Sequence, residues 1–331
     1  MSEPSAPLAV VTGASGFVGS HVVDELLRGG ARVRCLLRRT SSRRWLEGKP
    51  VELVTVSLDD PHRLARSLDG ADWVVHAAGL THATSAIRLH EANVKATETL
   101  LRATLEACPD LKRFLYVSSQ AAAGPSPDGR PVTEDQLPQP VSSYGESKLR
   151  GEKLVMLLAD RLPVTAIRPP GVYGPRDTAF LRAFVAAKRH VRPVLRKGGR
   201  FSLIHATDLA AAVRLLLTDD RAVGQVFFAA EPDLTDYEEF GAILTEAMGT
   251  WTVRITPPTF LLAAGAFLGE FVSGLTGRAT LMSREKFREI MSGDWLCSSA
   301  KIRSRLGWEP AIGLREGLLA TRDWYREARW V

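Results

Sequence analysis

Short apolar runs alternate with longer segments of helical spacing along most of this chain. Runs of strand length that are rich in β-branched residues occur at 8–11, 31–37, 51–56, 71–76, 111–117, 164–168 and 225–229. Between them lie segments whose apolar residues recur every three or four positions, such as 91–107 and 179–188. Strands that alternate with helices in this way predict an α/β fold with a doubly wound parallel sheet.

The first strand leads into a glycine-rich turn and then into a helix. Residues 12–19 read TGASGFVG, and the apolar residues of 18–27 follow at helical spacing. Gly13 would allow a tight turn, Gly16 would let backbone N–H groups approach a pyrophosphate, and Gly19 would let the helix pack close to the strand. The phosphates would then lie at the positively polarised N-terminus of the helix. We expect this turn to bind a dinucleotide through Gly13, Ser15, Gly16, Phe17, Val18 and Gly19.

The spacing TGxxGxxG resembles the extended branch of the short-chain dehydrogenase/reductase superfamily. That branch includes nucleotide-sugar epimerases, dihydroflavonol-type reductases and 3β-hydroxysteroid-dehydrogenase-like enzymes. The resemblance implies a Rossmann-type sheet followed by a smaller, mostly helical substrate domain. We expect residues 1–175 to form the NAD(P)-binding domain, with 202–230 returning to it, and residues 176–331 to form mainly the substrate-binding part.

A basic run follows the second strand, where a dinucleotide fold meets the adenosine ribose. NAD-selective sites usually hold an Asp or Glu there, whereas arginine accommodates a 2′-phosphate. This chain has no acid at the strand end and offers Arg38, Arg39, Arg43 and Arg44. A phosphate between Arg38 and either Arg43 or Arg44 would form charge-assisted hydrogen bonds. We therefore favour NADP(H). NAD stays open because some relatives with a similar arginine use it, and a solvated basic loop is the simpler alternative.

The resemblance implies further cofactor contacts. Ser57 stands where relatives typically have an adenine-binding Asp, and Leu58 would pack on the adenine ring. The Ala/Gly turn after the strand 71–76 would pass close to the nicotinamide ribose, because small residues let the backbone approach a flat cofactor. Asn93 matches the family's Asn-Val-x-Gly-Thr motif, with Ala96 in the glycine position, and would order the adjacent strand end. The remaining positions expected at the cofactor are Ala77, Ala78, Gly79, Pro170 and Val172.

A candidate catalytic pair follows the strand 111–117 and a Pro/Gly-rich loop. Ser143 and Glu146 have the spacing of a capping box, which predicts that a helix begins there. Tyr144 and Lys148 are then four residues apart on one face of that helix. A Tyr-x-x-x-Lys pair alone is common by chance, but here it occurs in a chain that opens with the glycine turn. We interpret His76, which ends another strand, as a structural residue.

The four-residue spacing of Tyr144 and Lys148 suits the interconversion of a ketone and an alcohol. A phenol of pKa ~10 is a poor base near neutrality, and the ammonium of Lys148 would stabilise the phenolate of Tyr144 and lower its pKa. Lys148 could also bind the nicotinamide ribose, while Ser119 would hydrogen-bond the carbonyl oxygen. We favour Ser119 over Ser118 because it lies five residues before Gly124, as the catalytic serine does in SSxxxxG-type relatives.

The second half of the chain resembles the family more in topology than in residues. Relatives that act on nucleotide sugars commonly have an arginine four residues before the histidine of this segment, where it binds the diphosphate. Phe201 occupies that place before His205, and Arg200 would point elsewhere on a strand. This departure argues against a nucleotide-sugar substrate. Thr235 and Glu238 form a second capping box, which predicts another helix.

The most apolar later segment is residues 260–275, which Glu270 and several glycines interrupt and which is shorter than the ~20 residues that a membrane span needs. The stretch 257–275 that contains it is rich in Phe and Leu. We expect it either to line or cover an apolar pocket, as for steroid-like or acyl-chain substrates, or to pack within the smaller domain. Peripheral membrane contact is the weaker alternative.

Composition narrows the classes of function. The hydrophobic share of 45% and the charged share of 24% are ordinary for a globular protein, and the net charge of +6 is spread along the chain, which does not indicate nucleic-acid binding. The cysteines are too widely spaced to indicate a disulfide framework or a metal site, and they favour a reducing compartment: Cys35, Cys108 and Cys297. The N-terminal residues lack the pattern of a secretory signal, so we expect a cytoplasmic protein.

These features predict an NADP(H)-preferring oxidoreductase that interconverts a secondary alcohol and a ketone on an apolar substrate, which is steroid-like, acyl or polyketide-like. A nucleotide-sugar epimerase or dehydratase is the alternative enzyme, because it shares the fold and the Tyr/Lys pair but returns the hydride to its substrate. A non-catalytic dinucleotide-binding regulatory protein is a second alternative, against which the complete Ser/Tyr/Lys set argues. Relatives often dimerise through helices near Lys95 and Lys148, so we also expect a homodimer.

Overall fold

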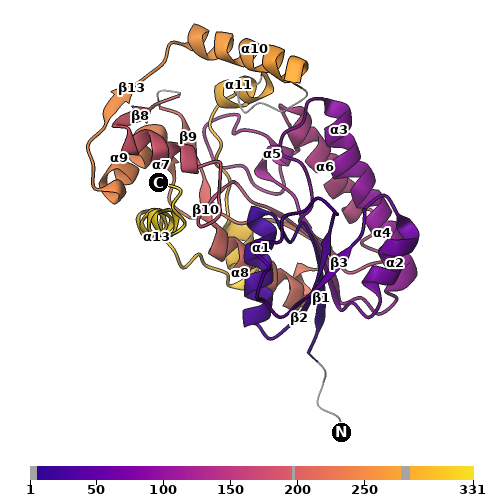
Figure 1. Ribbon diagram of the computed structural model, residues 1–331. Helices are drawn as coiled ribbons and strands as arrows, with labels where there is room; N and C mark the ends of the chain where they lie inside the picture. Colours follow the sequence, from indigo (N-terminus) through magenta and orange to yellow (C-terminus); the bar gives the residue numbers. More distant parts are fainter. Residues whose placement is uncertain (1–5, 196–197, 277–283) are drawn as a thin grey trace.

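The computed structural model describes residues 6–195, 198–276 and 284–331, with the side chains of 270–276 outside the description. A seven-stranded parallel sheet carries helices on both faces, and a smaller, mostly helical part lies beyond the carboxyl ends of its strands (Figure 1). This architecture confirms the predicted Rossmann-type fold. The first five residues, on which part of the argument about a secretory signal depends, lie outside the described residues.

The strands of the main sheet follow the order β11-β6-β5-β4-β1-β2-β3. The order reverses beside β1, and such a reversal creates a crevice at the carboxyl edge of an open α/β sheet. β4 and β5 begin two residues later than predicted, because Ala71 and Leu111 close hydrogen-bonded turns on Leu68 and Cys108. The strand bounds are β1 Leu8–Thr12, β2 Arg32–Leu37, β3 Val51–Thr55, β4 Trp73–His76, β5 Arg113–Val117, β6 Val164–Arg168 and β11 Gln225–Phe228.

Two separate cores lie on the two faces of this sheet. Along β1, Ala9 and Val11 face α1 and α8, whereas Val10 faces α2, α4 and α6. This alternation is the period of a strand that is buried on both faces. The helices in these layers and their connections are α1 Phe17–Arg28, α2 Pro61–Leu68, α3 Ala86–His90, the π-helical turn η1 Glu91–Lys95, α4 Ala96–Ala107, α5 Gln120–Ala123, α6 Ser143–Met156, α8 Ala206–Thr218, η2 Asp220–Ala222 and α12 Ala300–Leu306.

The smaller part has its own core, in which Phe184, Phe240, Leu318 and Tyr325 pack together from three helices. Those helices are α7 Leu181–Lys188, α9 Tyr237–Met248 and α13 Leu314–Glu327. Short strand pairs connect this part to the sheet and brace it: β7 Gly171–Tyr173 with β10 Leu203–His205, β9 Arg200–Phe201 with β12 Thr235–Asp236, and β8 Val191–Pro193 with β13 Val253–Ile255. Two further helices belong to this part: α10 Thr259–Thr276 lies on its outer side, and α11 Arg284–Met291 lies beneath α10 (Figure 1).

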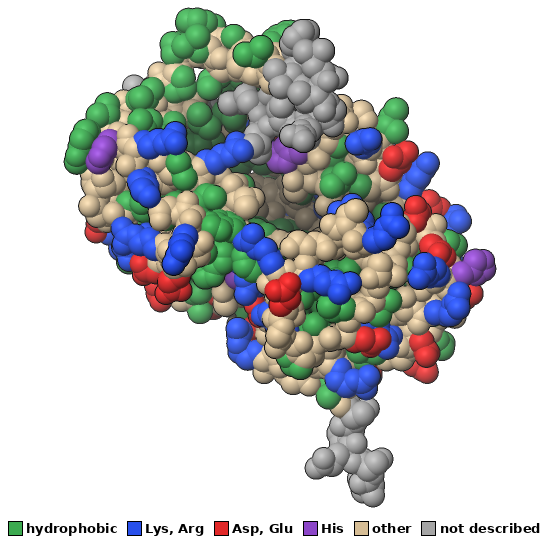
Figure 2. Space-filling model, in the orientation of Figure 1, with side chains coloured by type: hydrophobic (Ala, Val, Ile, Leu, Met, Phe, Trp, Pro, Cys, Tyr) green, Lys and Arg blue, Asp and Glu red, His purple; other side chains and the backbone are tan. Residues whose placement is uncertain are grey.

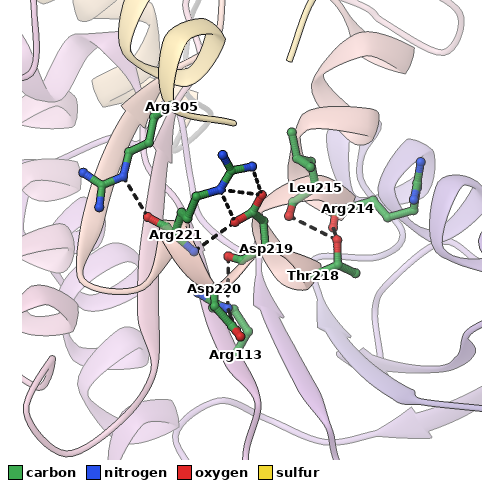
Figure 3. A network of polar contacts seen from close by, with 8 residues as sticks. All are labelled: Arg113, Arg214, Leu215, Thr218, Asp219, Asp220, Arg221 and Arg305. Atoms are coloured by element: carbon green, nitrogen blue, oxygen red, sulfur yellow. Dashed lines mark hydrogen bonds and ion pairs between the residues drawn. The ribbon is translucent and has the colours of Figure 1, made fainter. Parts of the chain in front are cut away.

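A cluster of arginines lies at the amino-terminal edge of the sheet, where α8 turns into β11 (Figure 3). Arg113, the buried first residue of β5, donates to the Asp219 carbonyl oxygen at 3.2 Å, and Arg221 forks the Asp219 carboxylate at 2.6 and 3.0 Å. Arg305 of α12 donates to the Arg221 carbonyl oxygen at 3.0 Å. Since these contacts fix the turn into β11 at the edge opposite the strand carboxyl ends, their role is structural.

Both predicted capping boxes are wrong by one residue. Ser142, not Ser143, caps α6 by accepting a hydrogen bond from the Gly145 N–H at 3.1 Å. The backbone N–H and hydroxyl of Ser143 instead donate to Glu285 of α11, a distant contact that local sequence does not show. In α9 the cap is Asp236, and its carboxylate accepts from two backbone N–H groups at 2.8 Å. A carboxylate is favoured at the positive end of a helix over the neighbouring threonine.

Candidate active site

A cavity of about 990 Å³ lies at the carboxyl edge of the sheet. One wall comes from the glycine turn, α6 and the ends of β4, β5 and β6, and the other comes from α7, β8, α9 and α11. Figure 2 shows the surface hollowed below α10, between the sheet and the smaller part. This size and this position at the switch point of an open α/β sheet are typical of a site for a small molecule and a cofactor.

The glycine turn packs so tightly against neighbouring backbone that a side chain at Gly13 or Gly19 would not fit. Gly13 has φ +71°, and a Cβ there would lie 2.6 Å from the backbone of Ala77. A Cβ on Gly19 would lie 2.1 Å from the Gly13 carbonyl oxygen. Gly16 caps α1 without a side-chain hydrogen bond, so the first N–H groups of the helix face the cavity uncapped. The turn therefore fits a pyrophosphate, with Phe17 and Val18 in the wall and Ser15 half-buried beside them.

Asn93 links three segments around the cavity. Its side chain is buried and pairs with the backbone of Leu80, accepting from the N–H at 2.8 Å and donating to the carbonyl oxygen at 2.9 Å. The same amide donates to Ser147 of α6 at 2.9 Å. A Cβ on Gly79 would lie 2.9 Å from the Asn93 Oδ1, so only glycine fits beside it. Asn93 lies in η1, which is a π-helical turn of the kind that often marks a functional site.

His76 is a structural residue of the sheet, in agreement with its interpretation from the sequence. Its ring is fully buried and bonds to Thr12 Oγ1 at 2.7 Å and to Thr97 Oγ1 at 3.0 Å. Burial, reinforced by the charge of Lys148, lowers the pKa of His76 to about 3, so the ring stays neutral. Thr12 Oγ1 also accepts from the Ala78 N–H at 3.3 Å, which fixes the Ala77–Gly79 turn at the cavity wall.

Ser119, Tyr144 and Lys148 meet in this cavity. Lys148 Nζ donates to the Val117 carbonyl oxygen at 2.7 Å and lies 4.2 Å from the centre of the Tyr116 ring. Ser119 begins α5, and its Oγ accepts from the second residue of that helix at 3.1 Å. A hydrogen bond with Ser119 also bears on the pKa of Tyr144. The sheet edge and the first turn of α6 therefore bring a hydroxyl, a phenol and an ammonium group together.

The expected lowering of the Tyr144 pKa is not found. Burial raises the pKa of Tyr144, the hydrogen bond with Ser119 opposes the rise, and the charge of Glu289 adds to it. Burial also lowers the pKa of Lys148 to about 7, against the opposing charge of Glu152. Desolvation is the largest cause of the pKa shift of Tyr144 and of Lys148. The Lys148 ammonium donates its hydrogen bond to the Val117 carbonyl oxygen. Tyr144 is thus held as a phenol at neutral pH, which suits proton donation.

Several residues of interest were missed from the sequence, of which Gln120 and Glu285 line the cavity and Glu152 does not. Glu152 lies four residues after Lys148, a spacing that could have revealed it, and forms a buried two-point ion pair with Arg168 at 2.9 and 2.5 Å. The Gln120 side chain is buried in the cavity wall, and its Nε2 has no hydrogen-bond partner among the described residues. Glu285 reaches the cavity from α11, for which the local sequence gives no signal.

The residues expected around the adenosine end lie at the rim of this region. β2 pairs with β1 up to Leu36, so Arg38 leaves the sheet at the same edge as the glycine turn. Arg38 and Arg43 are exposed, whereas Arg44 lies 3.6 Å from the centre of the Trp45 ring in a structural stack. Ser57 is exposed and Leu58 packs against the second core. In the described part of the chain, none of these residues lines the cavity itself.

The substrate side of the cavity is lined by many apolar side chains together with a few charged ones, among them Arg192, Lys286 and Glu289. Phe201 lines it, whereas Arg200 turns away, as strand alternation predicts, and pairs with Asp294 at 2.8 Å. Pro170 and Val172 form the wall between the two halves. Further apolar lining comes from the smaller part, through Phe180, Ala183, Val191, Phe240 and Leu244.

Of the two favoured expectations for residues 257–275, packing within the smaller part holds for some of the described residues, and lining of the cavity holds for none of them. Among its described residues, none lines the cavity, and the wall nearest to it is formed by α11. Packing within the smaller part explains only Leu262 and Ala266, because most of the other described side chains of α10 are exposed. The side chains from Glu270 onward lie outside the described residues. An apolar run with several glycines gives no clear helical face, so its pattern could not show which side would be covered.

Comparisons with known proteins place this architecture among dinucleotide-dependent enzymes. Residues 9–229 match the model of the NAD dependent epimerase/dehydratase family. The chain is 33% identical to a ceramide reductase of Caulobacter vibrioides, with 100% of this chain and 98% of that protein covered. It is 28% identical to a 4-hydroxy-2-methyl-3-oxo-4-farnesyl-3,4-dihydroquinoline-1-oxide ketoreductase of Stigmatella aurantiaca, covering 95% of each. The structure of a UDP-glucose 4-epimerase from Thermotoga maritima has the same fold, with a TM-score of 0.81, 22% identity, and 97% and 99% of the two chains covered.

Proposed function

Because this chain belongs to the NAD-dependent epimerase/dehydratase family, in the extended short-chain dehydrogenase/reductase superfamily, we propose that it is an NADP(H)-preferring ketoreductase or alcohol dehydrogenase for a substrate with a long apolar chain. The observation that carries this proposal is the group of apolar side chains that the smaller part adds to the cavity of Tyr144, among them Phe201 and Phe240. Phe201 offers no charge or donor to a diphosphate at its own position, whereas Arg192 and Lys286 are the basic side chains that line the cavity.

Three side chains of this site have separate roles in the reaction. When bound, the reduced nicotinamide supplies a hydride to the carbonyl carbon of a ketone. The Tyr144 phenol donates its proton to the carbonyl oxygen as the C–O double bond becomes a single bond, and the Lys148 ammonium stabilises the resulting phenolate. Ser119 donates a hydrogen bond that holds the same oxygen. Oxidation of the alcohol reverses each of these transfers, with the phenolate as the base.

The polar groups around the reacting oxygen indicate what else the substrate carries. Gln120 follows Ser119, and its buried Nε2 is free to donate among the described residues. A buried donor without a partner is costly, so a substrate acceptor beside the ketone would be favoured there. We propose that a carbonyl or hydroxyl oxygen next to the ketone accepts from Gln120. The named relatives act on a ceramide and on a farnesyl-bearing quinoline oxide, and the proposed substrate likewise joins a polar head to an apolar chain.

The remaining proposals concern the cofactor, the domains and the assembly. We propose that Arg38 and Arg43 hold the 2′-phosphate of NADP, since both are exposed at the edge of β2 and no acid replaces them there. Residues 1–175 with 202–230 would form the cofactor half, and residues 176–331 most of the substrate half. We also propose a cytoplasmic homodimer formed through α4 and α6. Sedimentation equilibrium tests the dimer, and a monomer at every concentration would exclude it.

The test of the function is a set of reductions followed by the loss of NADPH absorbance. We expect turnover of ketones with acyl or isoprenoid chains, and at least about a thousandfold loss of kcat in Tyr144→Phe. Lys153→Arg, at an exposed position of the same helix, is the control and should keep full activity. Tight retention of NAD with turnover of UDP- or dTDP-sugars would favour the epimerase alternative instead. Binding of the dinucleotide with no turnover of either substrate class would indicate a regulatory protein.

The cofactor preference has its own test. Arg38→Ala should lower the affinity for NADP by about tenfold and leave that for NAD unchanged, because only NADP carries the 2′-phosphate. Arg66→Ala, at an exposed position of α2, is the matched control. An unchanged NADP affinity in Arg38→Ala would refute the role of the basic run.

A further inference from the structure

Most of the large exposed hydrophobic side chains in the described part of the chain fall within residues 251–291. Phe260 exposes 69% of its surface, and Trp251 and Leu268 each expose 63%. In Figure 2 hydrophobic side chains gather along α10 and down the side that leads to β13. Scattered exposed leucines need no explanation, but aromatic and aliphatic residues gathered on one side of a molecule mark an interaction surface. We call Trp251, Val253, Ile255, Phe260, Leu261, Phe267 and Leu268 the docking face.

α10 has an inner and an outer side along its described part. Leu262 and Ala266, four residues apart, are buried against the protein. The residues of α10 that belong to the docking face point outward. Among the described residues, no helix is long and apolar enough to cross a bilayer. A helix that exposes aromatic side chains without spanning is suited to lie in the plane of a membrane interface.

The docking face borders the cavity of the proposed active site. β13, which carries Val253 and Ile255, pairs in parallel with β8, and the β8 residues Val191 and Pro193 line the cavity. α11 packs beside α10 and supplies Ile290 to the cavity wall. The elements that carry the docking face are therefore neighbours of those that enclose the apolar end of the cavity.

Basic side chains surround the docking face. Lys188 and Arg189 are exposed just before His190, whose ring stacks on Trp251 with centroids 4.1 Å apart. Arg284 lies 5.0 Å from the centre of the Phe267 ring, and Arg288 is exposed on the same helix, α11.

The acidic residues near this margin are engaged by partners. Glu238 pairs with Arg254, Glu289 pairs with Lys286 at 3.0 Å, and Glu285 accepts from Ser143. Beyond these pairs, the described residues of the margin include the exposed Lys188, Arg189 and Arg288, which outnumber the carboxylate of Glu285. Lys and Arg at the edge of an apolar surface, with a tryptophan at the boundary, match the headgroups of anionic lipids.

We propose that the docking face binds the surface of an anionic lipid bilayer, with Phe260 and Phe267 inserted among the acyl chains and the basic margin on the headgroups. From this position the cavity would take up its substrate directly from the bilayer, and this uptake rests on the proposed function. The docking itself does not depend on the reaction, because neither Tyr144 nor Lys148 takes part in it.

The test measures binding of the full-length chain to sedimented vesicles of phosphatidylglycerol and, separately, of phosphatidylcholine. We expect binding to the anionic vesicles that weakens with added salt, and weaker binding to the neutral ones. Phe260→Ser with Phe267→Ser should weaken binding about tenfold or more, because each substitution removes a large apolar group from the interface. Leu53→Ser, at an exposed position on the edge strand β3, is the control and should bind like the wild type.

A second measurement separates docking from catalysis. The double variant should reduce a water-soluble short-chain ketone at the wild-type rate and lose at least about tenfold in rate on a long-chain ketone presented in phosphatidylglycerol vesicles. Absence of reductase activity with intact vesicle binding would sink the proposed function and leave the docking proposal standing. Failure of the wild type to bind anionic vesicles would overturn the docking proposal, and so would a dimer that dissociates in the double variant, because a second copy would then cover the face.

Discussion

The charge of Lys148 predicts how the rate of ketone reduction depends on pH. Burial lowers the pKa of its ammonium from 10.5 to about 7. The ammonium is therefore present below about pH 7 and lost above it, while Tyr144, whose pKa is raised, stays a phenol over the whole range. In the proposed mechanism the ammonium stabilises the phenolate that forms on proton donation, so kcat for reduction should follow the charged fraction of Lys148.

The magnitude follows from the titration of a single group. With a pKa of about 7, the ammonium fraction falls tenfold for each pH unit above that value, to about one part in a hundred at pH 9. An unperturbed lysine would remain more than about nine-tenths charged at that pH. The two cases differ by about a hundredfold in kcat, which steady-state kinetics with saturating NADPH resolves easily.

Two variants assign the effect to this residue. Lys148→Arg keeps a positive charge at every pH of the assay, so its kcat should be lower but flat with pH up to about pH 9. Lys153→Arg, one turn further along α6 and exposed, should keep the wild-type profile. The reasoning fails if the wild-type profile is flat up to pH 9, or if the fall near pH 7 persists in Lys148→Arg.

Three further predictions concern the glycine turn, the π-helical turn and a buried acid. Gly19→Ala should abolish NADP binding by fluorescence titration, because its Cβ would lie 2.1 Å from a backbone oxygen, whereas Gly313→Ala, where nothing lies within 4 Å, should bind normally. Asn93→Ala loses three buried hydrogen bonds and should lower the free energy of unfolding by about 2–4 kcal/mol in urea; a loss below about 0.5 kcal/mol would contradict its linking role. Burial raises the pKa of Glu231 from 4.5 to about 7, so the folded state keeps a proton that the unfolded state releases in that window. The free energy of unfolding should fall by up to about 3 kcal/mol as pH rises through the window, and Glu231→Gln should abolish that fall.

The sheet could be predicted from the sequence because its information is local. In β1, Ala9, Val10 and Val11 are all apolar, which indicates a strand buried on both faces, and the glycines after it leave one way to continue. The pair Tyr144 and Lys148 could be predicted for the same reason, since four residues within one helix fix their relative placement. The observed strand ends and helix caps differ from the predicted ones by a residue or two, because each depends on the hydrogen bonds of the adjoining turn.

What the sequence could not predict depends on contacts between distant segments. Glu285 reaches the start of α6 from 142 positions away and moves the cap from Ser143 to Ser142. The direction of the Tyr144 pKa shift also required the fold, because the spacing with Lys148 gives the sign of one charge but not the degree of burial. Gln120 looked like an ordinary residue after the serine until the structure showed its amide buried in the cavity wall without a partner among the described residues.

Phe201 and the apolar run of α10 differ in how much the local sequence says about their surroundings. Phe201 can be compared with the expected arginine from a few neighbouring residues alone, whereas Arg192 and Lys286 reach the cavity from other segments. The apolar run of α10 gives the same pattern whether it lines a pocket, packs in a core or faces a bilayer, because all three environments favour the same side chains. Only the placement of Leu262 inward and Phe267 outward separates these cases. The vesicle experiment therefore tests the one of these three environments that the exposed side chains of α10 favour.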